Sequence, residues 1–417
     1  MADEKRSGRG FRRFMRQAHM VLGLASGLVV FIVAVTGCLW VFQEEIGNLL
    51  RDEPTIVAKE GPLVAPTAAR ETALGVYPGR GVHGVLYGQR DEPVEVIFYE
   101  ADPEFYSSVT LDPYSGEVIE AEDRLAGFFP FVLEGHMHLW MPEEIGKQVV
   151  GWSCMVFVVM LITGIILWWP RNRGSRGKRL RFVWNPTTRW KRKNWDLHAI
   201  LGFYASIVAL LAALTGLIMV FDWMREGVYT ALGGEKTVRF VVPDASPYTP
   251  DVTTVAIAPI DNLLPRLRAE YPEAEQFEIH YPHSDSASIY VEITYERGVY
   301  YSSDYRFYDQ RTLAEVETPS IYGTYAEAGV PDMVMRMNYD IHVGAILGLS
   351  GKILMFLASL VVASLPVTGT LLWWGRRKRG PGGVPGVKDV GDRRRKVPDI
   401  APVRPASHVV ARSSVVE

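Results

Sequence analysis

The sequence predicts an α-helical membrane protein, in which a bundle of four transmembrane helices carries two α+β domains outside the membrane. One observation is that four segments contain no Asp, Glu, Lys or Arg, and each is long enough to cross a bilayer core of about 30 Å as a helix. A second is that these segments repeat in sequence, which indicates an internal tandem duplication of helix, outer domain and helix. The uncharged segments are residues 17–43, 148–170, 197–221 and 353–375.

The repeat is clearest between the first and third segments. His19, Leu22, Gly23, Thr36, Gly37, Val41 and Phe42 recur as His198, Leu201, Gly202, Thr215, Gly216, Val220 and Phe221. The second and fourth segments match in the same way, since Thr163-Gly164 and Trp168-Trp169 recur as Thr368-Gly369 and Trp373-Trp374. The chain therefore reads as two copies of one unit.

The charges of the chain indicate its orientation. A net charge of -3 and 22% charged residues are ordinary values, but Lys and Arg cluster before the first segment, between residues 171 and 193, and directly after the last segment. The positive-inside rule places these ends, and both termini, in the cytoplasm. Because the basic clusters coincide with membrane exits, they indicate contact with lipid and not with nucleic acid.

These observations divide the chain into nine parts. The first apolar segment is too long for a secretory signal and is interpreted as a retained anchor. The tail is rich in Gly, Pro and Arg and is expected to be disordered. The parts are a cytoplasmic leader (1–16), a first helix (17–43), a first outer domain (44–146), a second helix (147–170), a basic cytoplasmic loop (171–196), a third helix (197–222), a second outer domain (223–341), a fourth helix (342–375) and a cytoplasmic tail (376–417).

Each outer domain is expected to contain a small antiparallel sheet, because short runs rich in β-branched and aromatic residues alternate with turn signals. The clearest turn is 112–116, Asp-Pro-Tyr-Ser-Gly. A helix is expected near 258–270. The predicted strands are 94–98, 108–111 and 117–119 in the first domain, and 278–281, 288–294, 299–302 and 305–308 in the second.

The repeated histidines His19 and His198 are candidate haem ligands. Each is followed at i+4 by a glycine, Gly23 or Gly202, which lies on the same face of a helix. An imidazole above a strip without side chains can bind a large flat group, and imidazole is a common axial ligand of haem iron. For a single histidine, plain helix packing would be the simpler reading; the second copy favours the ligand.

Three more histidines stand at the outer ends of the second and fourth helices: His136, His138 and His342. With His19 and His198 at the cytoplasmic ends, each leaflet would hold one histidine pair, which predicts two bis-histidine b-type haems per chain. Spacing leaves open whether His136 or His138 ligates the outer haem, since His342 lies 26 residues before its Thr-Gly pair, and His138 and His136 lie 25 and 27 before theirs. The histidines outside these helices, including His83, His280 and His283, are interpreted as ordinary surface or packing residues.

The glycines of the four Thr-Gly pairs are predicted to give the haems room. Gly37 lies 18 residues after His19, about 27 Å along a helix, so it reaches the outer site. We therefore expect each haem to take histidines from one pair of helices and space from the other pair. Gly37 and Gly216 would serve the outer haem, and Gly164 and Gly369 the cytoplasmic one.

These motifs resemble the PepSY-associated transmembrane proteins, a family of bacterial inner-membrane proteins. The matching pieces are His-x-x-Leu-Gly with Thr-Gly at 19–37 and 198–216, Thr-Gly-x-x-x-Trp-Trp-Pro at 163–170, Ile-His-x-Gly at 341–344, and a hairpin at 109–118 like the end of a PepSY domain. The second hairpin, at 308–313, lacks the usual proline and glycine. The histidine before the second helix is doubled in this chain, as His136 and His138. In the family the histidine at this place tends to stand three residues before a leucine, which favours His136 without excluding His138.

The resemblance implies a location in the bacterial inner membrane, with two periplasmic PepSY-like domains. It also implies a haem-dependent reductase that passes electrons to a ferric siderophore or another ferric chelate, for iron uptake. The electron donor would be a separate cytoplasmic protein or a quinol. The alternative is a protein without enzymatic activity, whose periplasmic domains bind or inhibit a partner such as a peptidase.

Overall fold

The computed structural model describes residues 2–50, 55–170, 176–245 and 259–377 of the chain. Two units are distinguished, residues 1–373 and 374–417, and the account below concerns the first. The predicted disorder of the tail falls almost wholly outside the described residues.

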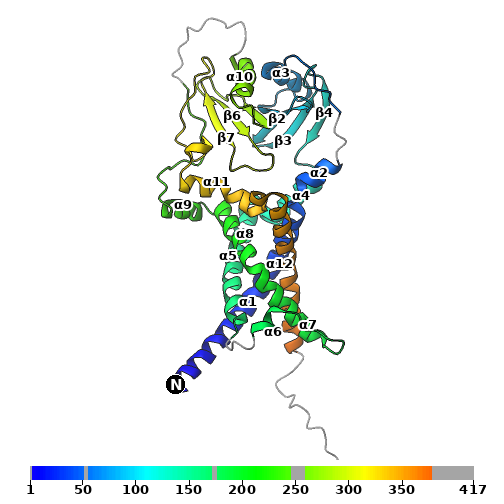
Figure 1. The fold of residues 1–417 in the computed structure, drawn as a ribbon, viewed down its shortest axis with the longest axis vertical. Coiled ribbons are helices and arrows are strands. Elements are labelled where there is room, and N and C mark those ends of the chain that lie inside the picture. The colour runs from blue at the N-terminus through cyan, green and yellow to red at the C-terminus, as the bar shows by residue number, and fades with distance from the viewer. Residues whose placement is uncertain (1, 51–54, 171–175, 246–258, 378–417) are drawn as a thin grey trace, which may run out of the picture. The chain divides into compact units, whose positions relative to one another are not determined.

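Within the described ranges, four helices are long and apolar enough to cross a membrane (Figure 1). They pack through a cluster of buried apolar side chains, among them Ala34, Phe157, Ala209 and Ala363. The third contains a π-helical turn at its histidine. The helices are α1 (Ala2–Trp40), α5 (Glu143–Trp168), the combined α7 (Trp190–Asp196), η2 (Leu197–Leu201) and α8 (Gly202–Val220), and α12 (Gly348–Arg377).

Two shorter helices, α4 (Phe128–His138) and α11 (Val330–Val343), stand immediately before α5 and α12. The chain breaks between α4 and α5 at Leu139 and Trp140, both with positive φ, and after α11 at Gly344 with φ of 86°. His136 and His342 consequently lie on the short helices α4 and α11, and not on the membrane helices that follow them.

The segment between α1 and α5 and the segment between α8 and α12 share one antiparallel sheet. We call them the two outer segments. Its seven strands within the described residues run in the order β4-β3-β2-β1-β5-β6-β7, so β1 pairs with β5 and joins the two halves of the chain. Helices α3 (Pro66–Val76) and α10 (Leu263–Glu270) pack on one face and bury Val85, Val96, Ile279 and Val291 with it. The strands are β1 (Val82–Tyr87), β2 (Val94–Ala101), β3 (Glu104–Leu111), β4 (Val118–Asp123), β5 (Gln276–His280), β6 (Ile289–Thr294) and β7 (Asp304–Tyr308).

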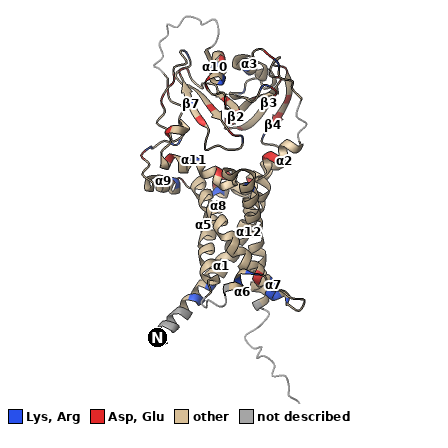
Figure 2. Ribbon diagram, viewed as in Figure 1, with Lys and Arg blue, Asp and Glu red and all other residues tan. Residues whose placement is uncertain are grey.

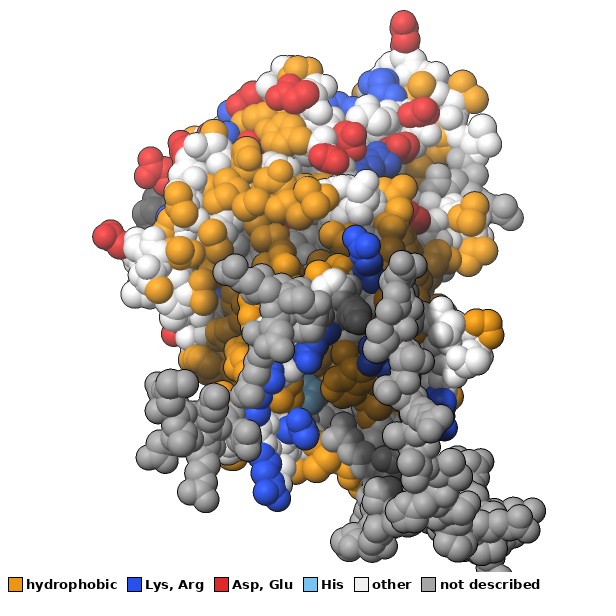
Figure 3. All heavy atoms as spheres, turned by 60° about the horizontal axis from the view of Figure 1, so that its bottom comes forward, with side chains coloured by type: hydrophobic (Ala, Val, Ile, Leu, Met, Phe, Trp, Pro, Cys, Tyr) orange, Lys and Arg blue, Asp and Glu red, His pale blue; other side chains and the backbone are white. Residues whose placement is uncertain are grey.

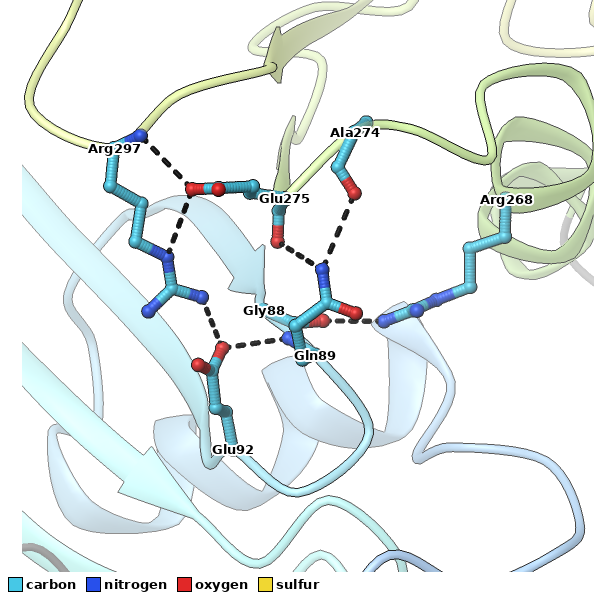
Figure 4. Close-up of polar contacts among 7 residues, drawn as sticks. All are labelled: Gly88, Gln89, Glu92, Arg268, Ala274, Glu275 and Arg297. Atoms are coloured by element: carbon cyan, nitrogen blue, oxygen red, sulfur yellow. Dashed lines mark hydrogen bonds and ion pairs between the residues drawn. The ribbon is translucent and has the colours of Figure 1, made fainter.

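Polar contacts reinforce the joint between the halves beyond the ends of β1 and β5 (Figure 4). The Gln89 amide donates to the carbonyl oxygens of Ala274 and Glu275, at 3.4 and 3.3 Å. Arg297 reaches back from the second half to Glu92 in the first. Arg268 donates to the carbonyl oxygen of Gly88 at 2.6 Å. The outer segments are therefore one structural body.

The sequence-based prediction of a strand at 299–302 is wrong. The segment is a turn held by α11, because the backbone N–H groups of Tyr300 and Tyr301 donate to the carboxylate of Asp340. Arg336, also on α11, donates to the carbonyl oxygens of Tyr301 and Ser303. A buried carboxylate and a buried guanidinium thus take the backbone groups that a sheet would have used.

The remaining described elements are short: α2 (Gln43–Leu50), α6 (Arg176–Leu180), α9 (Asp222–Ala231), η3 (Pro259–Asn262), η4 (Tyr325–Glu327) and η5 (Ala345–Leu347). Lys and Arg gather at the end of the bundle that carries α6 and α7, whereas Asp and Glu are spread over the sheet region (Figures 2 and 3). We call these the basic end and the sheet end of the bundle.

Candidate functional site

At the basic end, His19 on α1 faces His198 in the π-helical turn of the third membrane helix. The ring centres are 6.3 Å apart and the ring planes are nearly perpendicular, at 85°. Single π-turns inside α-helices occur frequently at functional sites, because the extra residue re-aims a side chain. The two histidines of the sequence repeat therefore form one pair.

At the sheet end, His136 on α4 faces His342 on α11. Their ring centres are 6.1 Å apart, with the planes at 67°. His138 is the last residue of α4 and its backbone packs against Gly146 at the start of α5. The structure thus brings His136, and not His138, to the position opposite His342.

In all four histidines, Nδ1 lies within hydrogen-bond distance of a threonine hydroxyl from a Thr-Gly pair on another helix. Each threonine already donates its own hydroxyl proton to a carbonyl oxygen one turn earlier in its helix, so its oxygen is left to accept from Nδ1–H. The Nδ1–Oγ1 distances are 2.9 Å for His19 and Thr163, 3.3 Å for His136 and Thr36, 2.9 Å for His198 and Thr368, and 3.0 Å for His342 and Thr215.

Backbone carbonyls support the same tautomer at the sheet end. Nδ1 of His136 lies 2.9 Å from the carbonyl oxygen of Val33, and Nδ1 of His342 lies 3.0 Å from that of Ala212. A carbonyl oxygen can only accept, so Nδ1 carries the proton and Nε2 keeps its lone pair. This is the state in which an imidazole binds a metal through Nε2, with its orientation set by the partner of Nδ1.

The glycines of the Thr-Gly pairs let the imidazoles lie directly against a helix backbone. A Cβ atom on Gly37 or Gly216 would be 3.1 or 3.2 Å from Cε1 of His136 or His342. On Gly164 and Gly369 it would be 3.4 and 3.3 Å from Cε1 of His19 and His198. Each glycine is thus at the end of the bundle that its spacing predicts, and it is the ring itself that needs the room.

The glycines four residues after the first histidine of each repeat have a different environment. A Cβ atom on Gly23 would lie 2.9 Å from the methyl group of Met160, and one on Gly202 would lie 3.4 Å from Leu365. Met160 and Leu365 hold equivalent places, three residues before Thr163 and Thr368. The helix faces at Gly23 and Gly202, which were predicted to lie against a flat group such as haem, are therefore covered by flexible apolar side chains.

Two buried asparagines that sequence reasoning missed bind the backbone of the threonine that faces the second histidine of each pair. Asn194 donates 3.0 Å to the carbonyl oxygen of Thr368, and Asn338 donates 3.1 Å to that of Thr215. Each stands one turn before its histidine, in the matching sequences Asn-Trp-Asp-Leu-His at 194–198 and Asn-Tyr-Asp-Ile-His at 338–342. This repeat was the available signal.

The distances within the pairs fit haem iron. Two trans imidazoles bound at about 2 Å from a metal, each with its ring centre a little over 1 Å beyond the nitrogen, have ring centres about 6 Å apart. The described residues contain no cluster of three or more His, Cys, Asp or Glu that could hold a bare metal ion.

Comparison with known proteins gives one result for the whole chain. No curated protein matches it. A family model described as the PepSY-associated TM region matches residues 16–376, which includes both histidine pairs and the whole sheet. The chain therefore belongs to the family of proteins with a PepSY-associated transmembrane region.

Proposed function

We propose that the protein binds two b-type haems and carries electrons across the membrane to an acceptor on the sheet side. The observation that supports this most is the pairing of four histidines into two sites at opposite ends of one bundle. In each site the ring centres are 6.1 or 6.3 Å apart and Nδ1 is tied to a threonine. Helix packing alone gives no reason for the same pair at both ends.

The assignment of residues follows from this geometry. His19 and His198 would hold the haem at the basic end, and His136 and His342 the haem at the sheet end. When bound, haem supplies a reversible one-electron couple. The chain fixes the imidazole tautomers through its threonines, restrains the rings through its glycines and asparagines, and surrounds the sites with apolar side chains that exclude water.

The direction of transfer rests on the charges. Lys and Arg gather at the basic end, which the positive-inside rule places in the cytoplasm. The sheet would then lie in the periplasm of a bacterial inner membrane. Electrons would enter from a cytoplasmic or quinol donor and leave beneath the sheet.

For the acceptor we propose ferric iron in a siderophore or similar chelate, which would make the protein a haem-dependent ferric-chelate reductase. This part rests on the family resemblance of the sequence. The reduction adds one electron to Fe³⁺ and gives Fe²⁺, which oxygen-rich chelates hold less tightly.

The test is a haem count on the detergent-purified protein, from its oxidised and dithionite-reduced spectra and a pyridine haemochrome assay. We expect two b-type haems per chain, and one in each of His198→Ala and His136→Ala. His138→Ala, altered two residues from His136, is the matched control and should keep both. A colourless protein after expression with ample haem would refute the proposal and favour a role in binding a periplasmic partner.

A further inference from the structure

A β-bulge in β1 places His83 on the sheet face opposite α3 and α10. The register of β1 against β2 shifts between Val82 and Gly84, so His83 is the extra residue. Val82 and Val85 both pack on the hydrophobic core, whereas the His83 ring points to the other face, 5.8 Å from the ring of Tyr99. Bulges re-aim side chains in this way, often next to functional sites.

His280, at the end of β5, lies beside it on that face. Gly84 stands directly across from His280 in the β1–β5 pairing. A Cβ atom on Gly84 would come within 3.2 Å of both Nδ1 of His280 and the carbonyl oxygen of Ile279. A glycine at this position therefore gives the His280 ring its place.

The His280 side chain is buried without hydrogen bonds. The residue is only 9% exposed, and neither ring nitrogen has a hydrogen-bond partner among the described residues. Burying a polar group without a partner is unfavourable, and native structures rarely do so without a reason. Stacking on Tyr290, at 4.2 Å, accounts for the ring face, whereas Nε2 lies 3.3 Å from Glu278 Oε1 without forming a hydrogen bond and Nδ1 has no hydrogen-bond partner.

The spacing of the two rings differs from that of the membrane pairs. The ring centres of His83 and His280 are 4.7 Å apart, with planes at 84°. Imidazoles that are neighbouring ligands of one tetrahedral or octahedral metal ion have ring centres roughly 4.4 to 5.2 Å apart, whereas trans ligands lie about 6 Å apart. The pair thus fits one ion shared between adjacent coordination positions.

Carboxyl groups surround this pair. Glu278 Oε1 lies 3.3 Å from Nε2 of His280, and Glu278 faces Glu292 directly across β5 and β6. A dication beside these groups would give the His280 ring nitrogens a partner and would lie next to the Glu278 carboxyl group.

We propose that His83 and His280 bind a first-row transition-metal dication on the sheet face opposite α3 and α10. The Glu278 carboxyl group lies beside this site. The two histidines would be the protein ligands and water would complete the coordination, because the described residues contain no group of three or more His, Cys, Asp or Glu placed to hold a metal ion. Imidazole with carboxylate suits Fe²⁺, Co²⁺, Ni²⁺ and Zn²⁺. The site does not depend on haem, although Fe²⁺ is the product of the proposed reaction.

The test uses the haem-loaded full-length protein, purified in detergent without a polyhistidine tag and washed with chelator. Equilibrium dialysis against Co²⁺, with cobalt counted by mass spectrometry, separates this ion from haem iron. We expect one cobalt per chain in the wild type, and binding weaker by about tenfold or more in His83→Gln and in His280→Gln. His283→Gln, an exposed histidine three residues after His280, is the matched control and should bind as the wild type does.

The two histidine variants test metal binding independently of misfolding and of haem binding. His83 is exposed in the bulge, so its replacement should leave the sheet intact even if His280→Gln disturbs the packing on Tyr290. Wild-type cobalt affinity in His83→Gln would overturn the proposal. A colourless protein that still loses cobalt binding in His83→Gln would refute the di-haem function and support this site.

Discussion

Asn338 lies one helical turn before His342 and donates to the carbonyl oxygen of Thr215, the same residue whose hydroxyl accepts from His342. Thr215 thus accepts hydrogen bonds from both His342, the proposed ligand, and Asn338, the residue that positions it. Asn194, His198 and Thr368 repeat the arrangement at the basic end. The first histidine of each pair, His19 or His136, follows a different residue at that spacing, so each proposed haem has one asparagine-supported ligand.

Replacing Asn338 with alanine should weaken the sheet-end haem. Losing this positioning hydrogen bond should speed haem transfer to excess apomyoglobin about tenfold. Asn338→Asp, which keeps the size but has no donor, should behave like the alanine variant. Asn194→Ala should affect the basic-end haem in the same way, and unchanged release from both variants would contradict the positioning role.

Gly216→Leu should remove the sheet-end haem and leave the other. The new side chain would start 3.2 Å from Cε1 of His342 and would push the ring away from His136. We expect the haemochrome count to fall from two to one. Gly10→Leu on α1 is the control, because a Cβ there meets nothing within 4 Å. Loss of the basic-end haem instead, seen in its separate redox wave, would show that the pairing is wrong.

Thr163→Val should raise the reduction potential of the basic-end haem. Valine keeps the shape of threonine but cannot accept from Nδ1 of His19, so the imidazole becomes a weaker donor and stabilises ferric iron less. A hydrogen bond worth roughly 1 kcal/mol corresponds to a shift of a few tens of mV. Redox titration of both haems measures it, and the sheet-end potential serves as the internal reference.

Arg336→Met should destabilise the sheet-end structure. Arg336 is 2% exposed and donates to three carbonyl oxygens, those of Tyr301, Ser303 and Gly323. Leaving these acceptors unpaired should cost about 3 kcal/mol or more, seen as a lower Tm in detergent. Arg80→Met, which breaks a partly exposed ion pair with Glu100, should cost less, about 1 kcal/mol. Equal shifts in both variants would argue against the role of Arg336.

The membrane helices could be predicted because absence of charge over a long segment is a local property of the sequence. Most strands were found for the same reason, through local alternation. The pairing of β1 with β5 could not be predicted, since it joins residues far apart in the chain. The β1 strand was also missed, because the bulge next to Gly84 interrupts its alternation. The strand predicted at 299–302 failed because Asp340 and Arg336, distant in sequence, take its backbone groups.

The choice between His136 and His138 could not be made by counting residues. The break at Leu139 and Trp140 interrupts the helix, so the distance from the Thr-Gly pair no longer has a helical period. The asparagines and the His83–His280 pair were missed for another reason. The asparagines are single polar residues outside the uncharged segments of the sequence, and a bulge changes which face of a strand a side chain occupies.

The joint between β1 and β5 also has a consequence for how the protein is made. While only the first half of the chain has been synthesised, β1 presents an open strand edge, because its partner β5 follows α8 in the sequence. Exposed edges are templates for wrong pairing. The edge of β1 is therefore covered only once the second half of the chain has been synthesised, so the two halves of the sheet complete each other.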